Sequence, residues 1–142
     1  MPNHSPDSEL AMALASARMR AIRMSLLNLH KTLLDAERHR YQRAHGVEIG
    51  SPHQVLQLVL RDPWFAWLRP ISELIVQADE RLSDDHPVQM EDVRAFASQV
   101  QQLLQHDLGG PQFRDEYHRS LQDLPDVVMA HAQIVKLLAE QG

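Results

Sequence analysis

One long apolar pattern near the N-terminus constrains the fold more than any other feature. Apolar residues recur three and four positions apart over some seven turns, the spacing that places them on one face of a helix. They are Met12, Ala15, Met19, Ile22, Leu26, Leu29, Leu33 and Ala36. A second stripe beside the first is Leu10, Leu14, Ala17, Ala21 and Met24. We expect residues 1–6 to be disordered, Asp7 or Ser8 to cap the helix, and Gly46 to end it after about His45.

This predicted helix is too long for a compact domain of 142 residues. At 1.5 Å per residue it would measure roughly 55 Å. Part of it is therefore expected to project beyond the core and pair with another subunit, which predicts a homodimer.

Further helices are indicated along the rest of the chain. Ser51-Pro52 and Asp62-Pro63 are typical helix starts, since each places a capping side chain before a proline. Pro70 should kink the second of these helices or mark its true start. Later helices are expected at about 90–107, 111–122 and from Asp126 onward. No segment alternates as a strand would, so we predict one all-α domain over residues 1–142. The expected architecture is an up-down helical bundle of four-helix-bundle type, with a long N-terminal helix and short extra helices.

Composition excludes several classes of protein. The chain has no cysteine, which removes disulfides, thiolate metal sites and cysteine nucleophiles, and fits a cytoplasmic protein. Its net charge of −5 makes nucleic acid an unlikely partner. Seven basic residues against two acids between Arg18 and Arg43 could face acidic neighbours, or an anionic ligand or RNA. The apolar runs are too short to span a bilayer, and the polar start predicts no signal peptide.

Nine histidines raise the question of a metal site. Di-iron bundles use Glu-x-x-His pairs, because residues three apart share a helix face. No glutamate here is followed by histidine at the third position, and no histidine has an acid four residues later. His-Glu-x-x-His and Gly-x-Ser-x-Gly are absent too. We therefore predict no cofactor, and the balance of motifs is against an enzyme.

A less conventional constellation lies along the first helix. Arg23, His30 and Glu37 are seven apart, with Tyr41 one turn further, so they line one edge of the apolar face. His131 interrupts the inward stripe of the last helix. Two hypotheses follow: a buried histidine beside a structural salt-bridge line, or a ligand pocket built by all five residues. In the second, His30, Glu37 and His131 are candidate ligands of a single metal ion.

The segment Asp62–Pro70 holds both tryptophans. On a regular helix Trp64 and Trp67 share the apolar face, whereas Phe65 points about 100° away. Either the preceding short helix covers Phe65, or the segment forms an interface with a second subunit or another partner. In that case Trp64, Phe65, Trp67 and Arg69 are its candidate residues, because aromatics and arginine concentrate binding energy.

Three stretches resemble an uncharacterised group of small bacterial all-helical proteins. They are Leu29–Arg38, Asp62–Pro70 and Asp126–His131, and with them the resemblance covers most of the chain. It implies a bacterial origin, and because that group has no assigned activity, it adds no catalytic residue. Taken together, the sequence predicts a non-catalytic interaction or small-ligand-binding bundle. The alternative is a histidine/carboxylate enzyme or metal-binding bundle centred on His30, Glu37 and His131.

Overall fold

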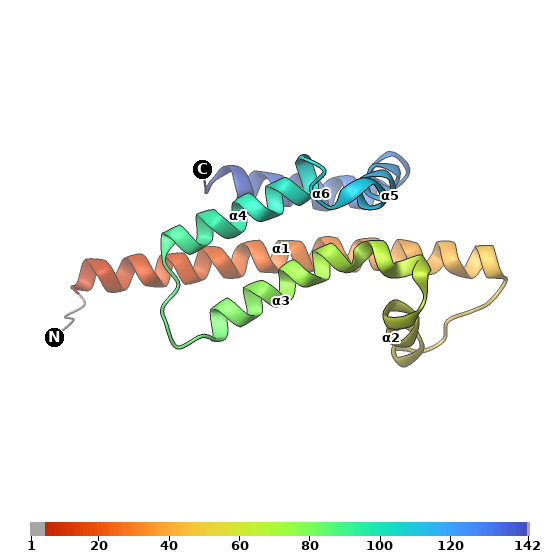
Figure 1. Ribbon diagram of the computed structural model, residues 1–142, viewed down its shortest axis with the longest axis horizontal. Helices are drawn as coiled ribbons and strands as arrows, with labels where there is room; N and C mark the ends of the chain where they lie inside the picture. The colour runs from red at the N-terminus through yellow and green to blue at the C-terminus, as the bar shows by residue number, and fades with distance from the viewer. Residues whose placement is uncertain (1–4, 142) are drawn as a thin grey trace.

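The computed structural model describes residues 5–141, and this part of the chain is helical without a strand (Figure 1). The predicted all-α class is therefore confirmed. The helices are α1 (Pro6–His45), α2 (Pro52–Arg61), the 3₁₀ helix η1 (Pro63–Leu68), α3 (Arg69–Ser83), α4 (Met90–Gln105), α5 (Gly110–Asp123) and α6 (Pro125–Ala139). Within residues 5–141, no helix is both long and apolar enough to cross a membrane.

Helix α1 is the axis of the molecule. It begins earlier than predicted, because the Ser5 hydroxyl accepts a hydrogen bond from the Ser8 backbone N–H at 3.1 Å and Pro6 occupies the first turn. Of the residues expected to be disordered, Ser5 and Pro6 thus start the helix, and residues 1–4 lie outside the described part. The helix ends at Gly46 as predicted, where a left-handed φ of 64° favours glycine.

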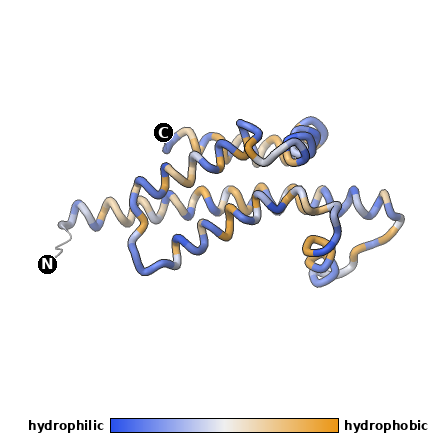
Figure 2. Tube along the Cα trace, in the orientation of Figure 1, coloured by the Kyte–Doolittle hydropathy of each residue, from blue (hydrophilic) through white to orange (hydrophobic). Residues whose placement is uncertain are grey.

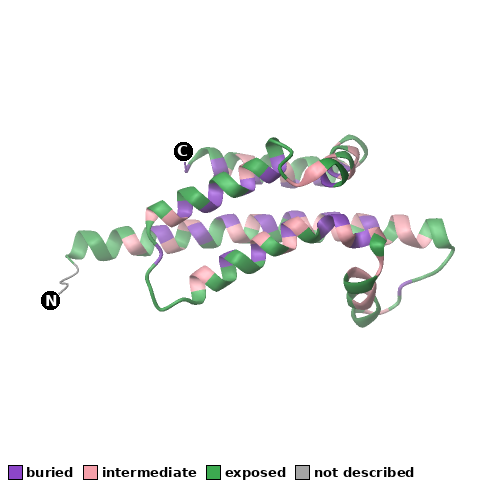
Figure 3. Ribbon diagram, viewed as in Figure 1, coloured by how far each residue is buried: buried purple, intermediate pink, exposed green. Residues whose placement is uncertain are grey.

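Three helices pack along α1 in alternating directions. Figure 1 shows α3 running back along α1, α4 running forward and α6 running back again. Helix α1 contacts all three, and α4 also contacts α6. The first turns of α1 extend beyond the others (Figure 3). Pro70 does not kink a long helix: the chain forms η1 first, and Pro70 lies in the first turn of α3, where its missing N–H is harmless.

The two apolar stripes of α1 have different environments. Six residues of the first stripe, from Ala15 to Leu33, are exposed by 1% or less and form the centre of the core. The second stripe was expected to widen this buried face, but all five of its residues are exposed. They lie about 140° around the helix axis from the first stripe. Figure 2 shows hydrophobic and hydrophilic residues mixed along α1.

Candidate functional site

The five residues predicted to share a pocket have separate partners. Arg23 pairs with Asp79 on α3, and Tyr41 donates to Asp62 before η1 at 3.1 Å. His30 contacts Ser72 on α3, Glu37 binds arginines of α1 and α5, and His131 contacts Tyr117 on α5. His131 thus bonds to neither His30 nor Glu37, as a shared site would require. Among residues 5–141, no three His, Cys, Asp or Glu side chains converge as metal ligands would.

Glu37 is the best-defined polar centre. Its side chain is 2% exposed at the point where the buried stripe of α1 reaches α5. Arg119 of α5 pairs with one carboxylate oxygen, and Arg40 donates to the other at 3.1 Å. Glu116 accepts from both arginines, at 2.9 Å and 3.4 Å. We call Glu37, Arg40, Glu116 and Arg119 the charge cluster. Two acids and two cations balance within it, so it stabilises the packing of α5 on α1 and presents no unmatched charge to a ligand.

The arginines of the charge cluster were not predicted. Burial alone would lower the pKa of Arg119, but the bonds and charges of Glu116 and Glu37 outweigh it and raise this pKa. The position of Glu37 was a usable signal, because it continues the spacing of Leu29 and Leu33 and a buried carboxylate needs a cation. Nothing in the sequence, however, indicates which helix supplies that cation.

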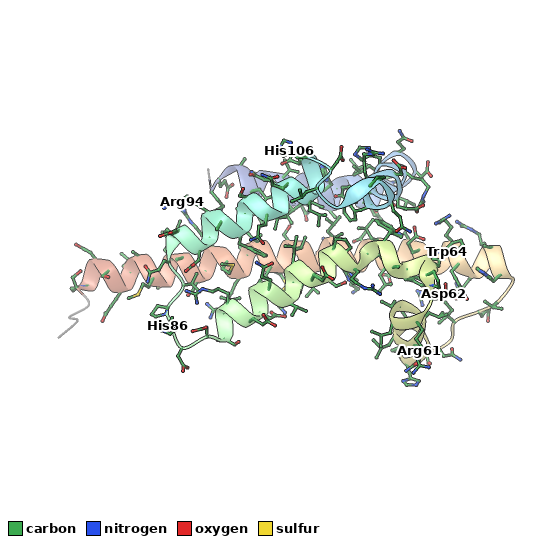
Figure 4. The ribbon with its side chains drawn as sticks, viewed as in Figure 1. Arg61, Asp62, Trp64, His86, Arg94 and His106 are labelled. Atoms are coloured by element: carbon green, nitrogen blue, oxygen red, sulfur yellow. The ribbon has the colours of Figure 1, made fainter. Side chains whose placement is uncertain are left out.

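Aromatic side chains join the end of α1 to η1. The Arg40 guanidinium lies 4.3 Å from the centre of the Trp64 ring, and Tyr41 stacks on His45 with centroids 4.0 Å apart. Asp62 accepts both from Tyr41 and, at 2.9 Å, from the Trp64 backbone N–H. Figure 4 shows Asp62 and Trp64 together at the turn that leads into η1, beside α1. One aspartate therefore caps η1 and attaches it to α1.

Two of the four interface candidates lie in the core of the chain itself. Phe65 is 2% exposed and Trp67 is 3% exposed. Helix α2 packs on η1 from one side, and Phe113 of α5 lies against Trp67 with centroids 5.8 Å apart. The 3₁₀ geometry of η1 gives Phe65 a different direction from the one expected on an α-helix. Phe65 and Trp67 therefore offer no exposed surface on the single chain; Trp64 is half-buried, and Arg69 is exposed.

The surroundings of two histidines, His30 and His131, disfavour the charged form of each imidazole. The Tyr117 hydroxyl and Nδ1 of His131 share a hydrogen bond of 2.6 Å, and burial raises the pKa of Tyr117. The Ser72 hydroxyl donates to the Leu68 carbonyl, so its oxygen accepts from Nε2 of His30 at 3.2 Å. Burial lowers the pKa of both histidines, and nearby His118 lowers that of His131 further.

These two histidines predict a loss of stability in mild acid. Below the ordinary pKa of 6.5 the unfolded chain takes up protons that the folded histidines resist. The free energy of unfolding should therefore be highest above pH 6.5. It should fall as the pH drops toward the lowered pKa values of His30 and His131. Urea unfolding between about pH 7.5 and about pH 5 measures this slope. The double variant His30→Gln with His131→Gln should flatten this slope, whereas His53→Gln, at an exposed position, should not. Equal slopes in the wild type, the double variant and His53→Gln would show that His30 and His131 do not cause the loss of stability.

Comparison of the chain with protein-family models, with curated proteins and with solved structures found no match in any of the three. Function is therefore inferred from the contacts and surfaces of the chain itself. The internal polar clusters are satisfied by their own partners, so the exposed surface of α1 becomes the main candidate.

That surface is the outer stripe of α1: Leu10, Leu14, Ala17, Ala21 and Met24. Leu10 is 70% exposed, and Met24 is 59% exposed. Beside Ala21 and Met24 a groove of about 550 Å³ separates α1 from the end of α6, with Lys136, Leu137 and Glu140 on its α6 side. The outer stripe and this α1–α6 groove adjoin each other, because Ala21 and Met24 belong to both.

Proposed function

We propose that this protein is a non-catalytic interaction module that works as a homodimer, with the outer stripe of α1 as its contact surface. In this proposal the helices α1, α3, α4 and α6 form an up-down bundle of four-helix-bundle type that supports the projecting end of α1. The cysteine-free composition supports a cytoplasmic location, and the resemblance to small bacterial helical proteins supports a bacterial origin.

The observation that carries the proposal is a second apolar stripe on α1 that lies outside the core. The first stripe meets α3, α4 and α6, whereas the outer stripe is exposed. An exposed apolar patch of this kind marks a contact surface. The outer stripe also alternates steps of four and three residues, which is the spacing of paired helices. Alanines at positions 17 and 21 allow the axis of a second helix to approach closely.

A second copy of the chain is the occupant that fits. Each copy would bring the same projecting segment and the same stripe, so one twofold axis covers both stripes at once. Two helices that overlap over residues 7–24 meet along about 27 Å. This contact is at the small end of specific interfaces, so the dissociation constant should be on the order of micromolar.

The histidine/carboxylate alternative has less support. A shared site needs His30, Glu37 and His131 around one cavity. Each of them instead has its own protein partner: Ser72 for His30, Arg119 for Glu37 and Tyr117 for His131. Glu37 in particular is matched by two arginines, which leaves its carboxylate no free oxygen for a metal ion. These contacts favour a structural role for all three residues.

Sedimentation equilibrium tests the proposed dimer. We expect the mass of the wild type to rise from one chain to two with concentration, and Ala17→Glu to raise the dissociation constant roughly 100-fold, because it buries two carboxylates at the twofold axis. Ala44→Glu makes the same change at an exposed position near the far end of α1 and should leave the dimer intact. A wild type that stays monomeric well above micromolar concentration, or an Ala17→Glu dimer, would refute the proposal.

A further inference from the structure

We infer that the two α1 helices pair antiparallel and that the first turn of each occupies the α1–α6 groove of the other. This inference rests on the proposed homodimer and specifies its geometry. It follows from the charges beside the outer stripe, from the position of the groove, and from the direction of α6.

Charges along the exposed half of α1 are separated by sign. Asp7 and Glu9 lie in the first turn, and Arg18 and Arg20 follow three turns later. None of the four forms an ion pair within residues 5–141. A parallel pair would bring the two acidic ends together and the two basic segments together. An antiparallel pair places the acidic turn of each helix beside the basic segment of the other, which favours this orientation.

The same charges select one register. When Leu14 lies opposite Ala17 of the partner subunit, Leu10 lies opposite Ala21 of the partner subunit, and four apolar layers form by symmetry. Glu9 is then offset by two residues, about 3 Å along the axis, from Arg20 of the partner subunit, on the same flank. Sliding the helices by one heptad keeps four apolar layers. It also sets each arginine beside its own copy, so like charges disfavour that register.

The α1–α6 groove meets the partner's first turn in the selected register. Asp7 of the partner subunit lies opposite Met24, which lines the groove together with Lys136 and Leu137. Lys136 is exposed and forms no ion pair within the described residues, so its ammonium is available to this carboxylate. Glu140 also lines the groove. Because α6 runs opposite to α1, Glu140 lies nearer Leu10 of the partner subunit, about one turn away from Asp7 of the partner subunit (Figure 1).

The rest of the molecule permits this arrangement. The two helices cross between Leu14 and Ala17, near the end that projects beyond α4 and α6 (Figure 3). Each projecting segment therefore lies along the part of the partner's α1 that is attached to its body, and the two bodies lie at opposite ends. A parallel pair would place both bodies side by side.

Disulfide crosslinking measures the orientation directly, because the chain has no cysteine of its own. Leu10→Cys and Ala21→Cys are made as separate proteins. In the inferred register, residues 10 and 21 of different chains share a layer, whereas identical positions are eleven residues, about 16 Å, apart. A disulfide needs Cα atoms within about 7 Å. We expect a mixture of the two proteins to crosslink under mild oxidation, and neither protein alone to do so.

The opposite pattern would overturn the inference. Crosslinks within each single variant and none between the two indicate a parallel dimer, which leaves the proposed homodimer standing. No crosslink in any sample, from a wild type that sedimentation shows to be dimeric, refutes the inferred register. If Ala17→Glu also leaves that dimer intact, the interface lies elsewhere and the proposed homodimer contact is refuted too. Sedimentation of each reduced variant confirms that it still dimerises.

Charge reversal tests the groove. Lys136→Glu should raise the dissociation constant about tenfold, because the twofold axis repeats the lost pair, and Asp7→Lys should do the same. Mixing the two variants should give a heterodimer with two opposite-charge pairs, one native and one with the charges exchanged, and this heterodimer should be tighter than either homodimer. Arg94→Glu reverses a charge on α4 that does not line the groove, and it should have no effect (Figure 4). The placement of the first turn in the groove would be refuted if Lys136→Glu left the dissociation constant unchanged. It would also be refuted if the mixed variants bound no more tightly than each variant alone.

Discussion

Replacing Glu37 by alanine should lower the free energy of unfolding by about 3–5 kcal/mol, because it leaves the partly buried Arg119 with only one of its two counter-ions. Arg119 is only 28% exposed and would retain Glu116 alone, which it shares with Arg40. The glutamate also continues the core stripe, so its removal leaves a cavity between α1 and α5. Urea unfolding at neutral pH measures the loss.

A double variant separates the ion pair from the packing. Glu37→Leu with Arg119→Leu removes both members of the most buried pair and leaves Arg40 beside Glu116. Hydrophobic residues of similar size often replace a buried ion pair at little net loss of stability. We therefore expect the double variant to be more stable than Glu37→Ala. A loss below about 1 kcal/mol for Glu37→Ala would show that the carboxylate is not needed in this position.

The helices themselves were largely predictable because their signals are local. Spacing of apolar residues, a proline in the first turn and a capping side chain all act within a few residues. This is why the break at Pro70 and the stop at Gly46 could be anticipated. The 3₁₀ conformation of η1 was not, since it depends on how Asp62 and Tyr41 fix the turn against α1.

Partners across the fold were the part that the sequence could not supply. The line through Arg23, His30 and Glu37 is real in its helical geometry, yet Arg23 and His30 meet α3 whereas Glu37 meets α5. His131 was correctly singled out as an exception in an apolar stripe, but its partner Tyr117 comes from α5. Pairings of this kind are decided by the relative placement of helices, which periodicity does not encode.

The outer stripe of α1 also shows what periodicity cannot predict, which is the partner that covers an apolar face. Its residues are apolar at helical spacing, which predicts burial without saying what covers them. Within one chain they are exposed, so the expectation of a broad internal face was wrong. The expectation that the projecting helix pairs with another subunit stays a prediction. The length of α1 was the better guide, because it exceeds what α3, α4 and α6 can cover (Figure 3).

Phe65→Ala should lower the free energy of unfolding by about 3–5 kcal/mol, as expected for a large aromatic side chain removed from a packed core. Its ring lies 5.6 Å from that of Tyr41 and is covered by α2, so truncation opens a cavity where η1 meets α1. Phe65→Leu fills part of the space and should lose much less stability. Leu60→Ala, on the exposed side of α2, is a matched control, because this leucine is 62% exposed.

The same variant distinguishes a core residue from an interface residue. If Phe65 acts only within its own chain, the dimer dissociation constant measured by sedimentation should be unchanged at a temperature where Phe65→Ala remains folded. The stability of the monomer and the affinity of the dimer would then respond to different residues, Phe65 and Ala17. A dimer weakened by Phe65→Ala with little loss of stability would instead place the subunit contact at η1, against its 2% exposure in the single chain.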